Sequence, residues 1–342
     1  MGKLRVTIFA DCGNSVGVGH VMRSLALAEA LTTAGAVVSW VTTISTVPWL
    51  ADLFSKRCIE ACEPPTGSMA TLKAITDTLP TIVVIDSYVN RTQLAQDLRR
   101  GNARVVAIAD EFTPPLPADL YVSPGIRAPW AEASTTRVIG GPENVLIRGD
   151  IRALRPQVWS PRPSASPRKI ALRLGGTDGD GAAPAVLASI LGLSSISYID
   201  VAPATEETAR AVSELSPTNG ARVGLTQAGP NSFSRAGGAD VVVTSAGVSA
   251  WEFACAGIPQ ILVETSADQR PNVEWFESQG CAAAVGSLAA IKSDSHSATE
   301  RLRKLLVDKA GLQRRSRTAW ERVDGNGAER VARAIQDVAA TP

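Results

Sequence analysis

Histidine is scarce in this sequence, and the cysteines form no metal or disulfide motif. The 342 residues include two histidines, His20 and His296, and five cysteines, an odd number without any Cys-x-x-Cys pair. The scarcity of histidine excludes a metal site built from several imidazoles. The cysteine pattern argues against a disulfide framework or a thiolate zinc site. If a histidine takes part in chemistry, it is one of these two.

An excess of one charge and long apolar runs are lacking as well. Lysine and arginine together number 34, against 33 aspartates and glutamates. This balance argues against nucleic acid or an anionic membrane as the main partner. The apolar run at residues 4–10 is too short for a secretory signal, and no window of about 18 apolar residues is present. We therefore expect a cytoplasmic protein with reduced thiols; the oligomeric state stays open.

The hydrophobic pattern of the first half predicts strands that alternate with helices. A strand is expected at residues 4–10 and a helix at about 20–34. Two continuous apolar runs, 81–86 and 104–110, each end in a carboxylate. Such runs are typical of buried parallel strands that carry a functional residue at the tip.

The same pattern restarts after a proline- and serine-rich stretch at residues 155–168, which is typical of a linker. The alternation predicts an α/β protein with two Rossmann-like, doubly wound domains of parallel strands. Ligands are expected in a cleft at the carboxyl ends of the strands. Strands are predicted in the second half at 169–174, 240–244 and 259–264, and the expected domains are 1–155 and 165–325, followed by a C-terminal helix at 326–342.

The loop after the first predicted strand carries the most specific motif. It contains Gly17, Gly19 and His20, with Arg23 in the helix that follows. The motif is neither a phosphate-binding Gly-Lys-Ser/Thr loop nor a complete Gly-x-Gly-x-x-Gly fingerprint. One interpretation is a tight turn with an incidental histidine. The other is that His20 acts as a base, because a helix N-terminus favours the neutral imidazole, which can accept a proton.

Two loops of the second half favour binding of a diphosphate. Their small residues would let backbone N–H groups approach an anion at a helix N-terminus, and Glu252 in the following helix could bind a ribose diol. The alternatives are small-residue turns packed on the sheet and a solvated glutamate. The predicted nucleotide-binding residues in the loops are Gly175, Gly176, Thr177, Ser245, Ala246 and Gly247.

Two further polar segments have alternative interpretations. Asp178-Gly-Asp180 has the form of the D-x-D motif of metal-dependent glycosyltransferases. We discount it, because this triplet often occurs by chance and helix dipoles can bind a diphosphate without a metal. Asp268 and Gln269 suit the hydroxyls of a sugar, although an ordinary polar helix cap explains them equally well.

Taken in order, these motifs resemble the UDP-sugar hydrolases of pseudaminic acid biosynthesis, which are grouped with spore-coat polysaccharide proteins. The resemblance lies in Asp11, in the Gly17-x-Gly19-His20-x-x-Arg23 block and in Asp86-Ser-Tyr88. It continues through Asp110-Glu111 and the loops of the second half, so that it covers about residues 4–285. The later loops are shared more widely with glycosyltransferases of the GT-B fold.

The resemblance implies a GT-B fold and inverting hydrolysis of a UDP-linked deoxy-diacetamido sugar. The histidine matching His20 would be the catalytic base, and the second domain would bind UDP without a metal or other cofactor. The sugar is expected to contact Asp11, Gly17, Gly19, Arg23, Tyr88, Asp268 and Gln269.

Two departures from the family pattern concern the sugar. This chain has Phe9-Ala-Asp11 where the family commonly has Arg-x-Asp, and Asp268-Gln269 where it commonly has Asn-Gln. Both positions are expected near the sugar, so they leave its identity open more than the use of UDP. Two other functions also stay open. One is an inverting glycosyltransferase with a small acceptor, and the other is a sugar-nucleotide sensor without catalysis.

Overall fold

The chain folds into two compact units. The computed structural model describes residues 3–13, 16–161, 169–176, 181–215, 217 and 220–340. Unit 1 comprises Met1–Gly149 and Asp324–Pro342, and unit 2 comprises Asp150–Val323. The C-terminal helix therefore belongs to unit 1. Residues 162–168 of the predicted linker lie outside the described residues.

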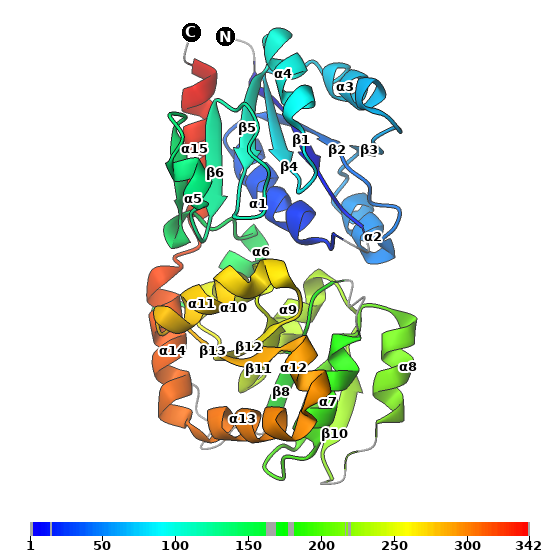
Figure 1. Ribbon diagram of the computed structural model, residues 1–342, viewed down its shortest axis with the longest axis vertical. Coiled ribbons are helices and arrows are strands. Elements are labelled where there is room, and N and C mark those ends of the chain that lie inside the picture. The colour runs from blue at the N-terminus through cyan, green and yellow to red at the C-terminus, as the bar shows by residue number, and fades with distance from the viewer. Residues whose placement is uncertain are drawn as a thin grey trace. The chain divides into compact units, whose positions relative to one another are not determined.

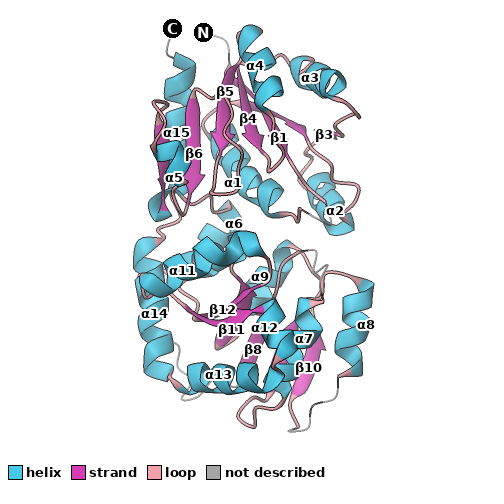
Figure 2. Cartoon of the chain, in the orientation of Figure 1, coloured by secondary structure: helices cyan, strands magenta, loops and turns pink. Residues whose placement is uncertain are grey.

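Unit 1 is built on a sheet of seven parallel strands in the order β3-β2-β1-β4-β5-β6-β7 (Figures 1 and 2). The strand order reverses between β1 and β4, and such a reversal is the usual ligand position in a doubly wound sheet. The strands are β1 (Arg5–Ala10), β2 (Val37–Val41), β3 (Ala61–Cys62), β4 (Ile82–Asp86), β5 (Arg104–Ile108), β6 (Leu120–Pro124) and β7 (Val138–Gly141). The helices are α1 (Gly19–Thr33), α2 (Pro48–Lys56), α3 (Ser68–Thr76), α4 (Thr92–Arg100), α5 (Pro129–Glu132), η1 (Pro142–Asn144) and α15 (Gly327–Ala340).

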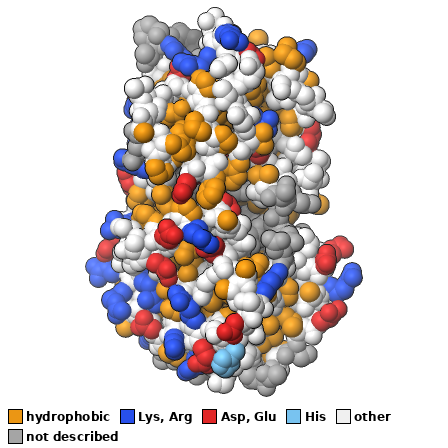
Figure 3. Space-filling model, viewed as in Figure 1, with side chains coloured by type: hydrophobic (Ala, Val, Ile, Leu, Met, Phe, Trp, Pro, Cys, Tyr) orange, Lys and Arg blue, Asp and Glu red, His pale blue; other side chains and the backbone are white. Residues whose placement is uncertain are grey.

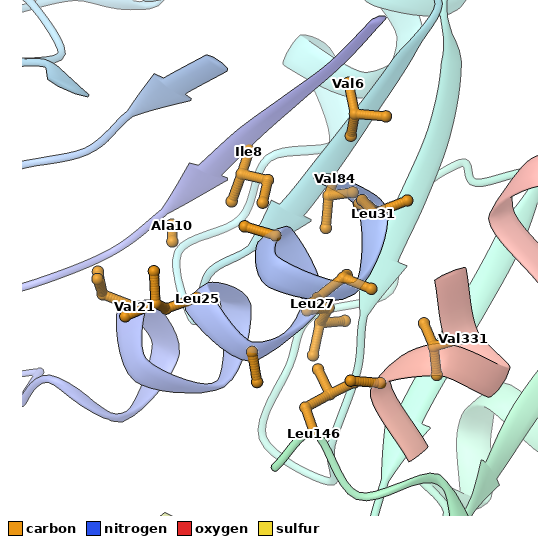
Figure 4. Packing of buried hydrophobic residues seen from close by; sticks show 14 of the residues in the cluster. Val6, Ile8, Ala10, Val21, Leu25, Leu27, Leu31, Val84, Leu146 and Val331 are labelled. Atoms are coloured by element: carbon orange, nitrogen blue, oxygen red, sulfur yellow. The ribbon is translucent and has the colours of Figure 1, made fainter. Parts of the chain in front are cut away.

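The core of unit 1 fixes the position of α1 on the sheet. Val21 and Leu25, one helical turn apart, lie beside Ala10 of β1, and Leu146 lies near Val331 of α15 (Figure 4). All five side chains are buried. Because α1 packs on the sheet along its length, the first turn of α1 has a fixed place at the end of β1.

Unit 2 repeats this topology with six parallel strands in the order β10-β9-β8-β11-β12-β13. Here the order reverses between β8 and β11. The strands are β8 (Lys169–Arg173), β9 (Tyr198–Val201), β10 (Arg222–Leu225), β11 (Val241–Ser245), β12 (Gln260–Glu264) and β13 (Ala283–Ser287). The helices, with α6 at the junction of the units, are α6 (Gly149–Arg152), α7 (Ala182–Leu191), α8 (Glu206–Glu214), α9 (Pro230–Ala236), α10 (Val248–Cys255), η2 (Ala267–Gln269), α11 (Arg270–Ser278), α12 (Leu288–Ser293), α13 (Ser295–Val307) and α14 (Lys309–Arg322).

The observed elements confirm the predicted fold class of two doubly wound, parallel α/β sheets. Figure 3 shows Lys and Arg side chains interspersed with Asp and Glu over unit 2. In the described part of the chain, no helix has both the length and the apolar character needed to cross a membrane.

Candidate functional site

The first candidate site lies where the strand order of unit 1 reverses. Ala10 at the end of β1 is in register with Asp86 at the end of β4, and the Asp11 N–H donates to the Asp86 carbonyl at 3.0 Å. The chain then turns back through Gly17, whose φ is +83° and whose N–H donates to the Gly13 carbonyl at 2.7 Å. A positive φ of this kind favours glycine. The turn leads into α1, which begins at Gly19, and places the next residue in the first helical turn.

His20 and Asp86 form a buried pair at this position. Their exposed fractions are 4% and 0%, and His20 Nδ1 is hydrogen-bonded to Asp86 Oδ1. Since a carboxylate is an acceptor, the Nδ1 atom carries the hydrogen. Within the described residues, His20 Nε2 has no hydrogen-bond partner. The neutral ring therefore keeps its lone pair on Nε2, where it can accept a proton.

Three other donors complete the environment of the Asp86 carboxylate. Arg23 Nε donates to Oδ2 at 2.8 Å and Arg23 Nη2 to Oδ1 at 2.5 Å, while Ser24 Oγ donates to Oδ2 at 3.1 Å. With His20, these four bonds use the acceptor sites of the carboxylate. Burial alone would raise the pKa of Asp86, but the Arg23 guanidinium and His20 outweigh burial and hold this pKa well below its usual range. Asp86 is therefore ionised at neutral pH.

Tyr88 and Asp110 connect the ends of β4 and β5 to this pair. The Tyr88 ring meets the His20 ring edge-on, with centroids 4.4 Å apart, and its hydroxyl donates to Asp110 Oδ2 at 2.9 Å. Arg23 Nη1 lies 3.4 Å from the same oxygen. The structure thus brings together three predicted site residues, His20, Arg23 and Tyr88.

Asp11 lies at the same edge of the sheet but has different partners. Its carboxylate accepts hydrogen bonds from Ser87 Oγ at 2.5 Å and from Arg91 Nη2 at 3.2 Å. The Arg91 guanidinium also stacks over the Phe9 ring, 4.9 Å from its centroid. Asp11 therefore ties the loop after β1 to the loop after β4.

The second candidate site lies where the strand order of unit 2 reverses. Gly175 has a φ of +103°, and a Cβ atom there would lie 4.0 Å from Ser245 Oγ, so the loops after β8 and β11 are close neighbours. Ser245 ends β11, and Gly247 is the N-cap of α10. Of the other predicted residues after β8, Gly176 is described, while Thr177 and the Asp178-Gly-Asp180 triplet lie outside the described residues.

Gln269 fixes the loop after β11. Its Oε1 accepts hydrogen bonds from the N–H groups of Ala246 at 3.1 Å and Thr265 at 3.2 Å. Asn272 Nδ2 donates to the Ala246 carbonyl at 2.8 Å. Asp268, the residue before Gln269, is half-buried in the short helix η2. The Gln269 oxygen is therefore used within unit 2, where it holds the backbone of the 245–247 loop.

Two further polar groups of unit 2 are buried. Glu252 is buried in α10 and engaged by a partner, so the alternative of a solvated glutamate is wrong. Arg173, at the end of β8, is paired with Asp200, and its Nη1 donates to the Asp200 carbonyl at 2.8 Å. Burial lowers the pKa of Arg173. No pattern in the sequence pointed to this pair.

Asp86, Asp110 and Ser24 were also missed as site residues, although a signal for the two aspartates exists. Asp86 and Asp110 each follow an apolar strand, and a carboxylate at the carboxyl end of a buried parallel strand is a usual sign of function. Ser24 gave no such signal. In the described residues, no group of three or more His, Cys, Asp and Glu side chains is arranged to hold a metal ion.

Comparisons with known proteins identify the fold of the chain. No protein-family model and no curated protein sequence matches the chain. Solved structures do match. MurG of Acinetobacter baumannii has a TM-score of 0.65 at 16% identity, covering 98% of this chain and 99% of that one. The UDP-GlcNAc 2-epimerase of Neisseria meningitidis bound to UDP-GlcNAc has a TM-score of 0.63 at 14% identity, with 98% and 100% covered.

A third similar structure is the spinosyn rhamnosyltransferase SpnG in complex with thymidine diphosphate. It has a TM-score of 0.64 at 17% identity, covering 97% of this chain and 100% of that one. At these identities the likeness shows the fold alone. The predicted GT-B fold is confirmed.

Proposed function

We propose that the protein hydrolyses the anomeric C–O bond of a UDP-linked sugar, with inversion and with His20 as the base. The observation that carries this proposal is the buried His20–Asp86 pair. It stands at a helix N-terminus and at the strand-order reversal of a GT-B unit. A base next to an orienting carboxylate is the arrangement that general-base catalysis requires.

The reaction needs few groups. His20 Nε2 takes a proton from water as the water oxygen forms a bond to the anomeric carbon on the face opposite UDP. The bond between the anomeric carbon and the UDP oxygen breaks, and its electron pair leaves with the diphosphate. Asp86 continues to accept the hydrogen bond from the Nδ1–H group and stabilises the imidazolium that forms. The proton on Nε2 then returns to solvent, which restores the base.

The 245–247 loop is assigned to the diphosphate. Its small residues precede the first turn of α10, where backbone N–H groups have no partner within the helix. Gln269 holds the loop backbone in place, as preorganised electrostatic stabilisation of a leaving group requires. Gly175 and Gly176 belong to the same assignment, and Glu252 is assigned to the ribose.

The sugar class rests on the family resemblance. We assign to the protein a deoxy sugar with acetamido or amino groups, as in the pathway to pseudaminic acid. Tyr88 and Asp11, at the edge that carries His20, are the candidate sugar contacts in unit 1. Gly17, Gly19, Arg23, Asp268 and Gln269 remain predictions for this role.

Glycosyl transfer is the second candidate, and the surface near His20 gives a reason to test it. Val16, Val89 and Phe112 are exposed in the loops after β1, β4 and β5. Hydrolysis needs only water, whereas an apolar acceptor would cover such side chains. His20 would then take a proton from the acceptor hydroxyl or amine.

A screen of UDP-sugars for release of UDP tests the proposal. Release in buffer alone, lost in the His20→Asn variant, would support hydrolysis. Release of UDP only after an acceptor is added would indicate glycosyl transfer and contradict hydrolysis. Binding of UDP-sugars without release under either condition would leave a sensor role and contradict both enzymatic functions.

A further inference from the structure

The Arg23 side chain points into the protein at the first candidate site. Only 13% of it is exposed. Two of its nitrogens donate to the two Asp86 oxygens, and the third lies 3.4 Å from Asp110 Oδ2. Although burial opposes its charge, Asp86 and then Asp110 raise the pKa of Arg23 above its usual value, so the guanidinium stays positive.

This geometry solves an electrostatic problem of the proposed base. A carboxylate next to an imidazole favours the protonated ring, but a general base must be neutral before it can accept a proton. Arg23 Nη2 lies 3.1 Å from His20 Nδ1. A positive charge this close disfavours a second positive charge on the ring.

We infer that Arg23 is a positioning residue for the proposed reaction: it orients Asp86 toward His20 Nδ1 and places a positive charge against both the carboxylate and the ring. The inference rests on the proposed function for its catalytic meaning. The paired bonds from Nε and Nη2 fix the carboxylate plane, which in turn fixes the hydrogen of His20 on Nδ1. Nε2 then remains the accepting atom.

The other charged and titratable groups of this region come from three elements. Asp86 ends β4, and Tyr88 follows it. Asp110 follows β5 and binds both Tyr88 and Arg23. Asp11 follows β1 and is paired with Arg91. Arg23 is therefore the positive group that contacts both His20 and two of the three carboxylates.

The scarcity of histidine makes a direct test possible. With only two histidines in the chain, the ring nitrogens can be followed by ¹⁵N NMR of the whole protein, with His296→Asn assigning the signals. The measurement gives the pH midpoint of His20 protonation and the nitrogen that carries the hydrogen. It needs no substrate.

Two substitutions should move this midpoint in opposite directions. Arg23→Gln removes the positive charge beside the ring, so the midpoint should rise relative to the unmodified protein. Asp86→Asn leaves Arg23 with Asp110 as its one carboxylate partner, so the midpoint should fall. Arg23→Lys keeps the positive charge but loses the paired bonds to Asp86. The His20 midpoint should then stay near its original value, while a smaller fraction of His20 carries its hydrogen on Nδ1.

A matched control is Arg57→Gln, which removes an arginine that pairs with Glu29 of the same helix α1. It should leave the His20 midpoint unchanged. An unchanged or lowered midpoint in folded Arg23→Gln would overturn the inference. If that variant does not fold, a midpoint that fails to fall in Asp86→Asn overturns it instead.

Failure of the proposed function has a separate signature. If no UDP-sugar is cleaved, the opposite NMR shifts would still establish the electrostatic role of Arg23. If UDP-sugar is cleaved, the acidic limb of the kcat/KM profile should coincide with the NMR midpoint in the unmodified protein and move with it in Arg23→Gln. Cleavage with an acidic limb unrelated to that midpoint would contradict the role of Arg23 in the reaction.

Discussion

The two strand-order reversals have the same topology and opposite chemistry. At the β1/β4 reversal, charged side chains are buried and paired, with Asp86 between His20 and Arg23. At the β8/β11 reversal, the described loops bring together glycine, alanine and serine, and Gln269 binds the backbone. A buried charged pair lies there too, Arg173 with Asp200, but it contains no histidine. One arrangement suits proton transfer, and the other suits an anion that approaches backbone N–H groups.

The contrast shows what topology decides and what it leaves to the residues. A doubly wound sheet places loops of two adjacent strands together at the reversal. It does not decide whether those loops carry a titratable pair or a backbone cradle. Variants of the two regions should therefore differ in kind. Those at the β1/β4 reversal should change turnover and pH dependence, and those at the β8/β11 reversal should change UDP affinity.

The largest expected effect comes from His20→Asn. Removal of a positioned base should lower turnover by at least about 10²–10⁴-fold, while the Kd for UDP stays within about twofold. The asparagine at position 20 keeps a polar side chain beside Asp86, but its amide cannot accept the proton. UDP release and calorimetric UDP binding measure the two quantities. His296→Asn, at an exposed position of α13, is the control; near-normal turnover in His20→Asn would remove the base from the mechanism.

Asp86→Asn should lower turnover by about 10²-fold, because the amide no longer fixes the His20 hydrogen on Nδ1 or stabilises the imidazolium. It should also cost about 3–5 kcal/mol in the free energy of unfolding at neutral pH, since Arg23 stays buried without its two-bonded carboxylate and keeps only the longer contact with Asp110. Asp97→Asn, a surface carboxylate of α4, should change neither quantity.

The difference in unfolding free energy between the unmodified protein and Asp86→Asn should depend on pH in a predictable direction. Because the folded pKa of Asp86 lies below its unfolded value, the ionised carboxylate stabilises the protein above the unfolded pKa of about 3.9. This contribution is lost as pH falls below that value. The gap in unfolding free energy between the unmodified protein and Asp86→Asn should therefore narrow below about pH 4. A gap that widens there would contradict the assignment.

Gln269→Ala should act at the other reversal. It leaves the Thr265 N–H without its side-chain acceptor, a loss of about 1–3 kcal/mol, while the Ala246 N–H still donates to the Val263 carbonyl at 3.2 Å. The Kd for UDP should rise by about tenfold, whereas the His20 titration should not move. Gln279→Ala, at the C-cap of α11, is the control. A shifted His20 titration with unchanged UDP affinity would break the proposed separation of roles.

The smallest effect is expected from Gly175→Ala. A φ of +103° disfavours alanine, so the free energy of unfolding should fall by about 1–2 kcal/mol, with weaker UDP binding. Gly280→Ala provides a close match, because its φ is +65° and no atom of the described residues would lie within 4 Å of the added Cβ. It should cost similar stability and leave UDP affinity unchanged. Equal loss of affinity in both variants would indicate a general effect of backbone strain.

The sequence predicted the elements that are long and apolar. The strand predicted at 81–86 is observed at Ile82–Asp86, and the helix predicted at 20–34 is observed at Gly19–Thr33. The strands β6, β7, β9 and β13 were not predicted, nor were the short strands β3 and β10. Strands β3 and β10 have two and four residues, which is too short for a period to appear, and they are stabilised by pairing with their neighbours in the sheet.

The site was predictable in position and only partly in its contacts. The glycine-containing loop identified His20 as the candidate base, and the tips of two strands pointed to Asp86 and Asp110. That Asp86 binds His20, 66 residues away in the chain, depends on the register of β1 with β4. Gln269 was predicted to contact the sugar, and its oxygen is observed on the backbone of the 245–247 loop. This contact likewise depends on how the strands of unit 2 pair, which a local pattern does not show.

The most direct test of the central claim is cleavage of a UDP-sugar in water labelled with ¹⁸O. Water activated by His20 attacks carbon, so the account predicts one ¹⁸O atom in the released sugar, with inverted anomeric configuration, and none in UDP. Mass spectrometry of both products and NMR of the first-formed sugar anomer read these outcomes. Label in UDP, or a first-formed sugar with retained configuration, would contradict the account.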